Sequence, residues 1–229
     1  MRTRTLALAA ASGAAVLAAA ALPASAESSA GGPAEVAVGA AELLAHVETC
    51  NRISHGMYRT DQGTPADIPV CGTGEAVFWK ADMDIDCDGR TTAVCNKKTD
   101  PSFQPQTAFQ TSAGKHLDAG KLPYIVVPGP GPIWKYAGSG IKGGSVAAVI
   151  HGGKVEYAVV GDTGPTGIIG EASYATARAL GIDPDPRTGG AASGVTYILF
   201  RNSEVSPIED HAAAVAEGEA LARKFLAGG

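Results

Sequence analysis

The sequence lacks the motifs that mark several large classes of enzyme. It contains no G-x-S-x-G elbow of a serine hydrolase. No apolar strand leads into a Walker A loop or a G-x-G-x-x-G phosphate loop. It has no C-x-x-C pair, and its five histidines are scattered, which argues against a zinc site. With only 3 Met and 2 Trp residues, no cofactor-binding box stands out. We therefore expect neither a metal ion nor an organic cofactor.

Long apolar segments are absent except at the start of the chain. Residues 6–22 are apolar and rich in alanine, Arg2 and Arg4 precede them, and residues 24–26 read Ala-Ser-Ala. This pattern predicts a secretory signal peptide over residues 1–26. Residues 27–40 have few large side chains and are interpreted as a flexible leader. Residues 41–229 are then expected to form a single domain, secreted to the extracellular space, with no membrane segment once the signal peptide is removed.

Basic residues are fewer than acidic residues. The chain has 18 basic and 23 acidic residues, for a net charge of −5, and loss of Arg2 and Arg4 would make it −7. An acidic secreted protein is poorly suited to bind nucleic acid. Its long-range field instead attracts cationic ligands. We expect a monomer that acts on a positively charged partner.

Only four cysteines are present, namely Cys50, Cys71, Cys87 and Cys95. An even number in an exported chain predicts two disulfides, for which three pairings are possible. We favour the pairing of sequence neighbours, Cys50 with Cys71 and Cys87 with Cys95.

Short apolar runs separated by turns dominate the rest of the chain. Strands are expected in residues 74–86, 122–129 and 195–200, and a hairpin over residues 145–161 around a Gly-Gly turn. Helices are expected near residues 43–47, over 171–180 with Gly181 as its end, and over 211–226. The sequence therefore predicts a mainly β domain with attached helices, built on a barrel or a sandwich.

The segment YAVVGDTGPTGIIGEAS, residues 157–173, holds the first chemical candidates. Asp162-Thr163-Gly164 resembles an aspartic protease triplet, but that dyad needs two such triplets and the chain has one. Asp162 and Glu171 could instead be the acid and base of a glycosidase. Burial at a strand end would raise the pKa of Asp162, which suits the acid, and a helix start would favour ionised Glu171, which suits the base. Both residues are also ordinary in turns and caps.

The run DMDIDCDG places acidic residues at every second position from 82 to 88. On a strand, Asp82, Asp84 and Asp86 would share one face and repel one another. The run matches the opening of an EF-hand loop, but Cys95 stands where that loop has its bidentate glutamate. A groove for a polycationic substrate and a solvated acidic turn are the other interpretations. Trp79 and Trp134 could stack on sugar rings or fill the core.

Together these stretches resemble a known family. FWKADMDIDCDG, LPYIVVP, VVGDTGP and IGEAS, in that order, resemble the fungal-type chitosanases of glycoside hydrolase family 75, including its secreted actinomycete members. The resemblance implies inverting endo-hydrolysis of β-1,4-linked glucosamine in chitosan, with Asp162 and Glu171 as the essential pair. We expect substrate to be bound by the following residues: Asp82, Asp84, Asp86, Thr163 and Trp79.

The strand that ends in Gly-Asp-Thr-Gly also looks like part of a six-stranded double-psi β-barrel, which we take as the expected fold. Two other functions stay open. One is a barrel hydrolase or lytic transglycosylase that acts on peptidoglycan, although that polymer is anionic. The other is a non-catalytic, expansin-like glycan-binding protein, which would need neither carboxylate.

Overall fold

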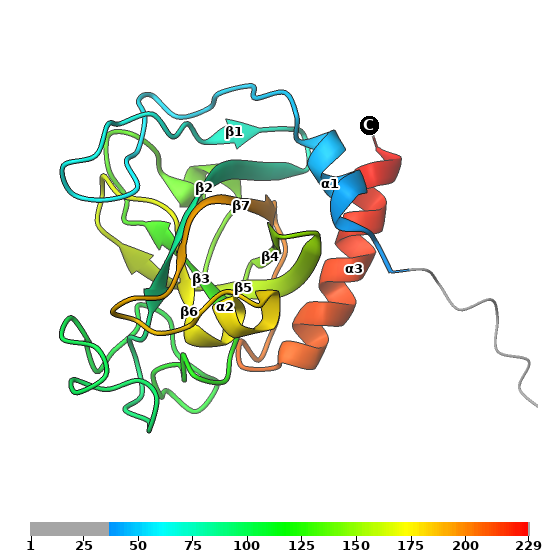
Figure 1. Cartoon of the computed structure of the whole chain (residues 1–229). Coiled ribbons are helices and arrows are strands. Elements are labelled where there is room, and N and C mark those ends of the chain that lie inside the picture. Colours follow the sequence, from blue (N-terminus) through cyan, green and yellow to red (C-terminus); the bar gives the residue numbers. More distant parts are fainter. Residues whose placement is uncertain (1–36, 229) are drawn as a thin grey trace, which may run out of the picture. The chain divides into compact units, whose positions relative to one another are not determined.

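The structure is a computed structural model that describes residues 37–228. The expected signal peptide, residues 1–26, and most of the expected leader, residues 27–40, lie outside the described residues. Among the described residues, no helix is both long and apolar enough to cross a membrane. The elements in chain order (Figure 1) are α1 (Ala40–His46), β1 (Cys71–Gly72), β2 (Ala76–Asp86), β3 (Tyr124–Pro128), η1 (Tyr136–Ser139), β4 (Val146–His151), β5 (Lys154–Gly164), β6 (Glu171–Ser173), α2 (Tyr174–Leu180), β7 (Ala191–Phe200) and α3 (His211–Ala227).

Six strands close into a barrel. Around the barrel the order is β2, β6, β3, β5, β4 and β7, and β7 pairs again with β2. The β2–β6 and β3–β5 pairs are parallel, and the other pairs are antiparallel. The two-residue strand β1 adds to β2 outside this ring. The expected mainly β fold, with a six-stranded barrel core and attached helices, is confirmed.

The β4–β5 hairpin shows how local sequence builds the barrel wall. The expected turn is observed, with His151 paired to Lys154. Gly152 and Gly153 have φ angles of 55° and 79°. A two-residue turn with positive φ at both positions matches the right-handed twist of its strands, and glycine adopts such angles without a steric cost.

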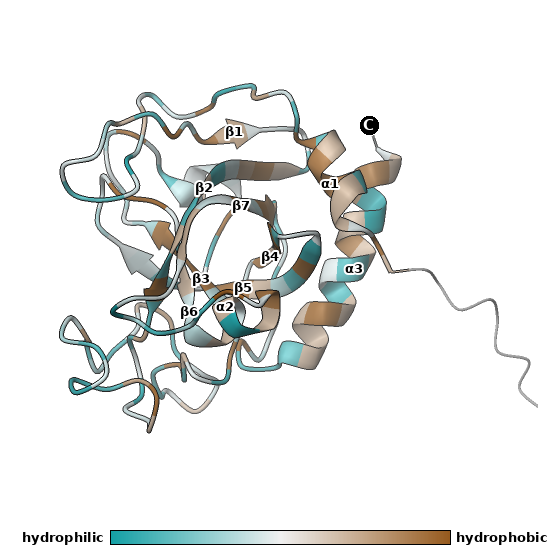
Figure 2. Ribbon diagram, in the orientation of Figure 1, coloured by the Kyte–Doolittle hydropathy of each residue, from teal (hydrophilic) through white to brown (hydrophobic). Residues whose placement is uncertain are grey.

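Apolar side chains pack against both sides of the barrel wall. Inside, Trp79 stacks on Tyr197, with the ring centroids 5.3 Å apart. Outside, α3 packs on β4 and β5, and α1 packs on α3. Figure 2 shows hydrophobic and hydrophilic residues mixed along α3, as expected for a helix with one buried face. Gly218 allows the close approach, since a Cβ there would lie 2.3 Å from Cδ1 of Tyr157.

The two longer helix predictions have different outcomes. The helix expected over residues 211–226 is confirmed as α3, and the Asp210 side chain caps it by accepting a hydrogen bond from the N–H of Ala213 at 3.0 Å. The helix expected to begin at Glu171 begins at Tyr174 instead. Ser173 caps it by accepting from the N–H of Thr176, and a cap residue ends the helix on its N-terminal side. Residues 171–173 therefore form strand β6.

Two disulfides join the expected neighbours. Cys50 is bonded to Cys71, which ties the segment before the barrel to β1. Cys87 is bonded to Cys95 and closes the loop that follows β2. This loop carries part of the acidic run, so the second disulfide fixes acidic side chains as well as backbone.

Candidate active site

Acidic side chains from three strands line up across the outer face of the barrel. Asp84 of β2 is in register with Glu171 of β6, and Val126 of β3 is in register with Glu171 on one side and Asp162 of β5 on the other. Residues in register on neighbouring strands project from the same face. Ala172, next to Glu171, belongs to the interior cluster, so Glu171 and its neighbours face outward. The barrel thus brings the two predicted catalytic carboxylates to one surface.

A β-bulge aims Asp162 at this surface. In the β3–β5 ladder, Ile125 lies opposite Val160 and Val126 lies opposite Asp162, so Gly161 is an extra residue. Val160 faces the interior, and strict alternation would turn Asp162 inward as well. Because the bulge inserts one extra residue, Asp162 projects from the outer face instead.

The carboxylate of Asp162 is held by backbone donors. Its Oδ1 accepts hydrogen bonds from the N–H groups of Ala108 and Thr163, each at 2.7 Å. The side chain is buried, with 7% of the residue exposed. Burial raises the pKa of Asp162, and the two N–H donors and the charge of His116 oppose that rise. Thr163, expected to bind substrate, therefore contributes its backbone to the position of Asp162.

Glu171 lies in a different environment from the one its sequence predicts. It is on strand β6, three residues before α2, so the positive end of a helix does not stabilise its charge. Burial raises the pKa of Glu171 well above its usual value, and the negative charges of Asp86, Asp84 and Asp88 raise it further. A carboxyl group in these surroundings retains its proton at a pH where an exposed glutamate has lost it.

A pocket of about 340 Å³ adjoins Glu171. Six carboxylates line it: Asp84, Asp86, Asp88, Asp100, Glu171 and Asp185. Arg187 is the only basic residue in the lining. Burial raises the pKa of Asp86 to about 8 and that of Asp88 to about 6, with neighbouring carboxylates adding to both shifts. So many acidic groups in a confined space favour a positively charged ligand, because a cation stabilises their ionised forms. We call this space the acidic pocket.

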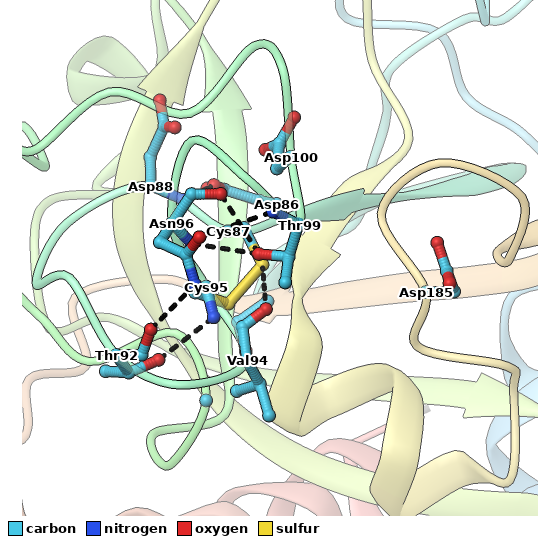
Figure 3. The surroundings of a disulfide bond; sticks show 12 residues. Asp86, Cys87, Asp88, Thr92, Val94, Cys95, Asn96, Thr99, Asp100 and Asp185 are labelled. Carbon is cyan, nitrogen blue, oxygen red and sulfur yellow. Dashed lines mark hydrogen bonds between the residues drawn. A yellow bond between two sulfur atoms is a disulfide. The ribbon is translucent and has the colours of Figure 1, made fainter.

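The wall of the acidic pocket is fixed by its own backbone and by the second disulfide. Asp86 and Asp88 flank Cys87, whose bond to Cys95 is drawn in Figure 3. Asp86 Oδ1 accepts a hydrogen bond from the N–H of Asp88 at 2.6 Å, and Asp88 Oδ1 accepts one from the N–H of Gln104 at 2.6 Å. These bonds orient the carboxylates without neutralising them. In Figure 3, Asp185 comes from a separate loop.

The structure separates Asp82 from the acidic pocket. Asp84 and Asp86 line that pocket as expected, but Asp82 lines another cavity of about 410 Å³, together with Lys80 and Thr60. Asp82 is 6% exposed, and burial raises its pKa to about 7. Gly170, just before Glu171, lies against the Asp82 carboxylate. The acidic run is therefore divided between two cavities.

Trp79 is buried inside the barrel, where it cannot stack on a sugar ring as expected. It is 1% exposed and sits inside the barrel between Tyr197 and Trp134. Alternation explains this, because Trp79 has the parity of Ala81 and Met83, which also face the interior. The ring supports the barrel from within.

Several acidic-pocket residues have no clear signal in the sequence. Asp100 lies on the loop after β2, and Asp185 reaches the pocket from a loop far along the chain. Asp185 belongs to the segment Asp-Pro-Asp-Pro, residues 183–186, which the sequence marks only as the end of a helix.

Within residues 37–228, no group of three or more His, Cys, Asp or Glu side chains is placed to hold a metal ion. Asp84 and Asp86 lie on the extended strand β2, which does not wrap around an ion as a calcium loop does.

Comparison with known proteins gives the family. Residues 83–225, more than half of the chain, match the model of the fungal chitosanases of glycosyl hydrolase group 75. The chain belongs to glycoside hydrolase family 75. The matched range includes Asp84, Asp86, Asp162 and Glu171, and it begins after Trp79 and Asp82.

Curated relatives of this family 75 chain are fungal. It is 37% identical over 145 residues to an endo-chitosanase of Aspergillus fumigatus, covering 58% of this chain and 61% of that protein. It is 34% identical over 157 residues to endo-chitosanase C of Aspergillus oryzae, covering 64% of this chain and 38% of that protein. It is 35% identical over 130 residues to endo-chitosanase B of Aspergillus oryzae, covering 53% and 54%. The matches thus span from 38% to 61% of the length of these relatives.

Proposed function

We propose that this protein is a secreted endo-chitosanase that hydrolyses the β-1,4 linkages between glucosamine residues of chitosan, with inversion at the anomeric carbon. The observation that carries this proposal is the register of Asp162 and Glu171 on either side of Val126, next to the acidic pocket. Family membership and relatives named endo-chitosanases support it. Residues 41–229 would form the single catalytic domain. The signal peptide pattern and the two disulfides support secretion.

The sheet geometry supports inversion. Asp162 and Glu171 are separated by one strand, and strands lie about 4.8 Å apart, so their Cα atoms are about 10 Å apart. Inverting glycosidases have carboxyl groups about 6.5–9.5 Å apart, which leaves room for a water molecule between sugar and base. Two carboxylates on alternate strands of one sheet face can act on opposite sides of a bound sugar with water between them.

We assign Glu171 as the general acid and Asp162 as the general base. Glu171 keeps its proton because burial and neighbouring carboxylates raise its pKa. Asp162 uses Oδ1 to accept two N–H groups, which favour its ionised form and leave Oδ2 to accept a proton from water. This assignment reverses the one expected from sequence, because Glu171 is not at a helix start. Glu171 protonates the leaving glycosidic oxygen as the C–O bond breaks, and water attacks the anomeric carbon as its proton passes to Asp162.

The acidic pocket supports a polycationic substrate. In mildly acidic water, glucosamine units carry ammonium groups, and each can pair with one or more carboxylates of the pocket. An ammonium group near Asp86 or Asp88 favours the ionised carboxylate, so binding draws protons off residues whose pKa is raised in the free protein. The excess negative charge also steers the polymer toward the site at low ionic strength.

The test is to incubate the purified protein with chitosan, chitin and peptidoglycan and to follow product size and anomeric form by NMR. We expect chitosan to be cut to short oligomers whose first-formed reducing ends are α. An absence of chitosan cleavage contradicts the proposed activity, and a β-anomer as first product contradicts inversion.

Two amide variants test the assigned pair. Glu171→Gln and Asp162→Asn should each lower kcat by about 10²–10⁴-fold, since each removes a proton-transfer group from the transition state. Thermal unfolding of both variants serves as the control for folding. Glu171→Gln should be about as stable as the wild type, because a neutral amide replaces a carboxyl group that burial and its neighbours keep protonated.

A further inference from the structure

The loop over residues 104–117 reaches the catalytic surface and supplies a donor to Asp162. The N–H of Ala108 is that donor, at 2.7 Å from Oδ1. Its neighbour Thr107 ties the two arms of the loop together, because Thr107 Oγ1 accepts a hydrogen bond from the N–H of Leu117 at 3.1 Å. Thr107 is buried. The position of the Ala108 donor therefore depends on how firmly Thr107 is held.

His116 lies beside both backbone polar groups of Thr107. Nδ1 of His116 lies 3.0 Å from the Thr107 nitrogen and 3.2 Å from the Thr107 carbonyl oxygen. A neutral ring with its proton on Nε2 accepts the N–H of Thr107 at Nδ1. A proton on Nδ1 would face the Thr107 N–H, a second donor, at 3.0 Å, so the accepting form of the ring fits this contact. His116 therefore anchors the backbone of Thr107 by accepting its N–H.

Thr107, which His116 anchors, also belongs to the peptide group that serves Asp162. The C=O of Thr107 and the N–H of Ala108 are the two ends of one peptide unit. Because His116 fixes Thr107 on one side of this unit, it also fixes the direction of the Ala108 N–H toward Asp162. The charge of His116 adds to this by lowering the pKa of Asp162.

We propose that His116 is a positioning residue of the hydrolase, which orients the Asp162 carboxylate and stabilises its charge through the Thr107–Ala108 peptide group. The inference rests on the proposed function of Asp162 as general base. His116 does not contact the substrate in this scheme.

Charged groups of both signs surround the other side of the His116 ring. It lines a cavity of about 370 Å³. The charged and titratable residues of that cavity, besides His116, are Arg90, Lys115, Asp118, Lys121, Glu209 and His211. Of these, His211 pairs with Glu156 at 2.7 Å, and Lys121 lies 4.0 Å from Asp118.

Two substitutions of His116 distinguish a role in orienting Asp162 from a role in the stability of the fold. An asparagine amide can occupy the place of Nδ1 and either accept from N–H or donate to C=O, whereas a glutamine amide lies near the place of Nε2. We expect His116→Gln to lower kcat on chitosan about tenfold with KM unchanged, the effect of one lost hydrogen bond to a charged system. His116→Asn should retain most of kcat. Lys115→Gln, which removes a charge from the same loop without contacting Thr107, should behave as wild type.

The pH profile supplies the second readout. In His116→Asn the positive charge is missing, so the pKa of Asp162 rises and the acidic limb of kcat/KM moves to higher pH. Equal kcat for wild type, His116→Asn and His116→Gln would overturn the inference. An equal loss of kcat in both variants, accompanied by a loss of thermal stability, would also overturn it, because His116 would then have only a structural role. The proposed function is judged separately, because it fails only if the wild type leaves chitosan uncut or Asp162→Asn retains full activity.

Discussion

Gly161 is the residue on which the orientation of Asp162 depends, so its substitution by alanine is a direct test of the bulge. An alanine Cβ at this position would lie 2.6 Å from Cβ and Cγ of Tyr124 and 2.8 Å from Cδ1 of Leu117. These distances are shorter than any ordinary carbon–carbon contact, and all three atoms belong to fully buried residues. The strand must therefore move, and Asp162 is the next residue along it.

The structure gives the size of the effect. Overpacking of a well-filled core costs about 1–3 kcal/mol, so we expect the free energy of unfolding to fall by about that amount. Shifting the register by one residue would relieve the contact but would bury Asp162 inside the barrel, which costs more. The strand should instead tilt away from Tyr124 and lengthen the two 2.7 Å bonds of Asp162. A displacement of this kind, even of about 1 Å, should lower kcat on the order of 10²-fold.

The assay compares Gly161→Ala with Gly167→Ala. Gly167 lies between the same two carboxylates, and a Cβ there meets nothing within 4 Å. Urea unfolding gives the stability of each variant, and initial rates on chitosan give kcat. Gly167→Ala should retain both. If Gly161→Ala matched wild type in both measurements, the bulge would not control Asp162 and the reasoning would be refuted.

Three further predictions concern the surroundings of the site. Asp84→Asn removes a negative charge that raises the pKa of Glu171, so Glu171 should lose its proton at lower pH. The alkaline limb of the kcat profile should then move to lower pH, and an unchanged limb would contradict this. Trp79→Ala should lower the free energy of unfolding by about 3–5 kcal/mol, measured by urea titration, and leave KM for chitosan unchanged, whereas a raised KM in a stable protein would indicate sugar stacking. Replacing Cys87 and Cys95 by alanine should cost about 2.5 kcal/mol of stability for so short a loop and raise KM for chitosan, because the acidic pocket loses its fixed wall; an unchanged KM would count against that role.

Local patterns in the sequence predict much of the fold and less of the site. The hairpin over β4 and β5 and the helix α3 follow from apolar periodicity and from glycines at turns. The favoured pairing of neighbouring cysteines is the one observed, although the sequence by itself allows three pairings. The prediction that α2 starts at Glu171 is wrong. Glu-Ala-Ser-Tyr resembles the first turn of a helix, whereas the strands that pair with Glu171, β2 and β3, are distant in sequence.

The environment of each carboxylate could not be predicted for the same reason. The pKa of Glu171 depends on Asp84, Asp86 and Asp88, which lie more than 80 residues away along the chain. Asp82 and Asp84 have the same parity on β2, but a loop from elsewhere covers only Asp82. Periodicity assigns a side chain to a face of a strand, and the tertiary contacts decide whether that face is open.

Val126 has a consequence for how such enzymes can vary. It carries no chemistry, but as the residue between Glu171 and Asp162 it makes their separation a property of hydrogen-bonded sheet spacing. The chain that links the two carboxylates, residues 165–170, only has to leave β5 and enter β6. Insertions or deletions there can therefore lengthen or shorten the loop beside the two carboxylates while the sheet keeps Glu171 and Asp162 in the same register.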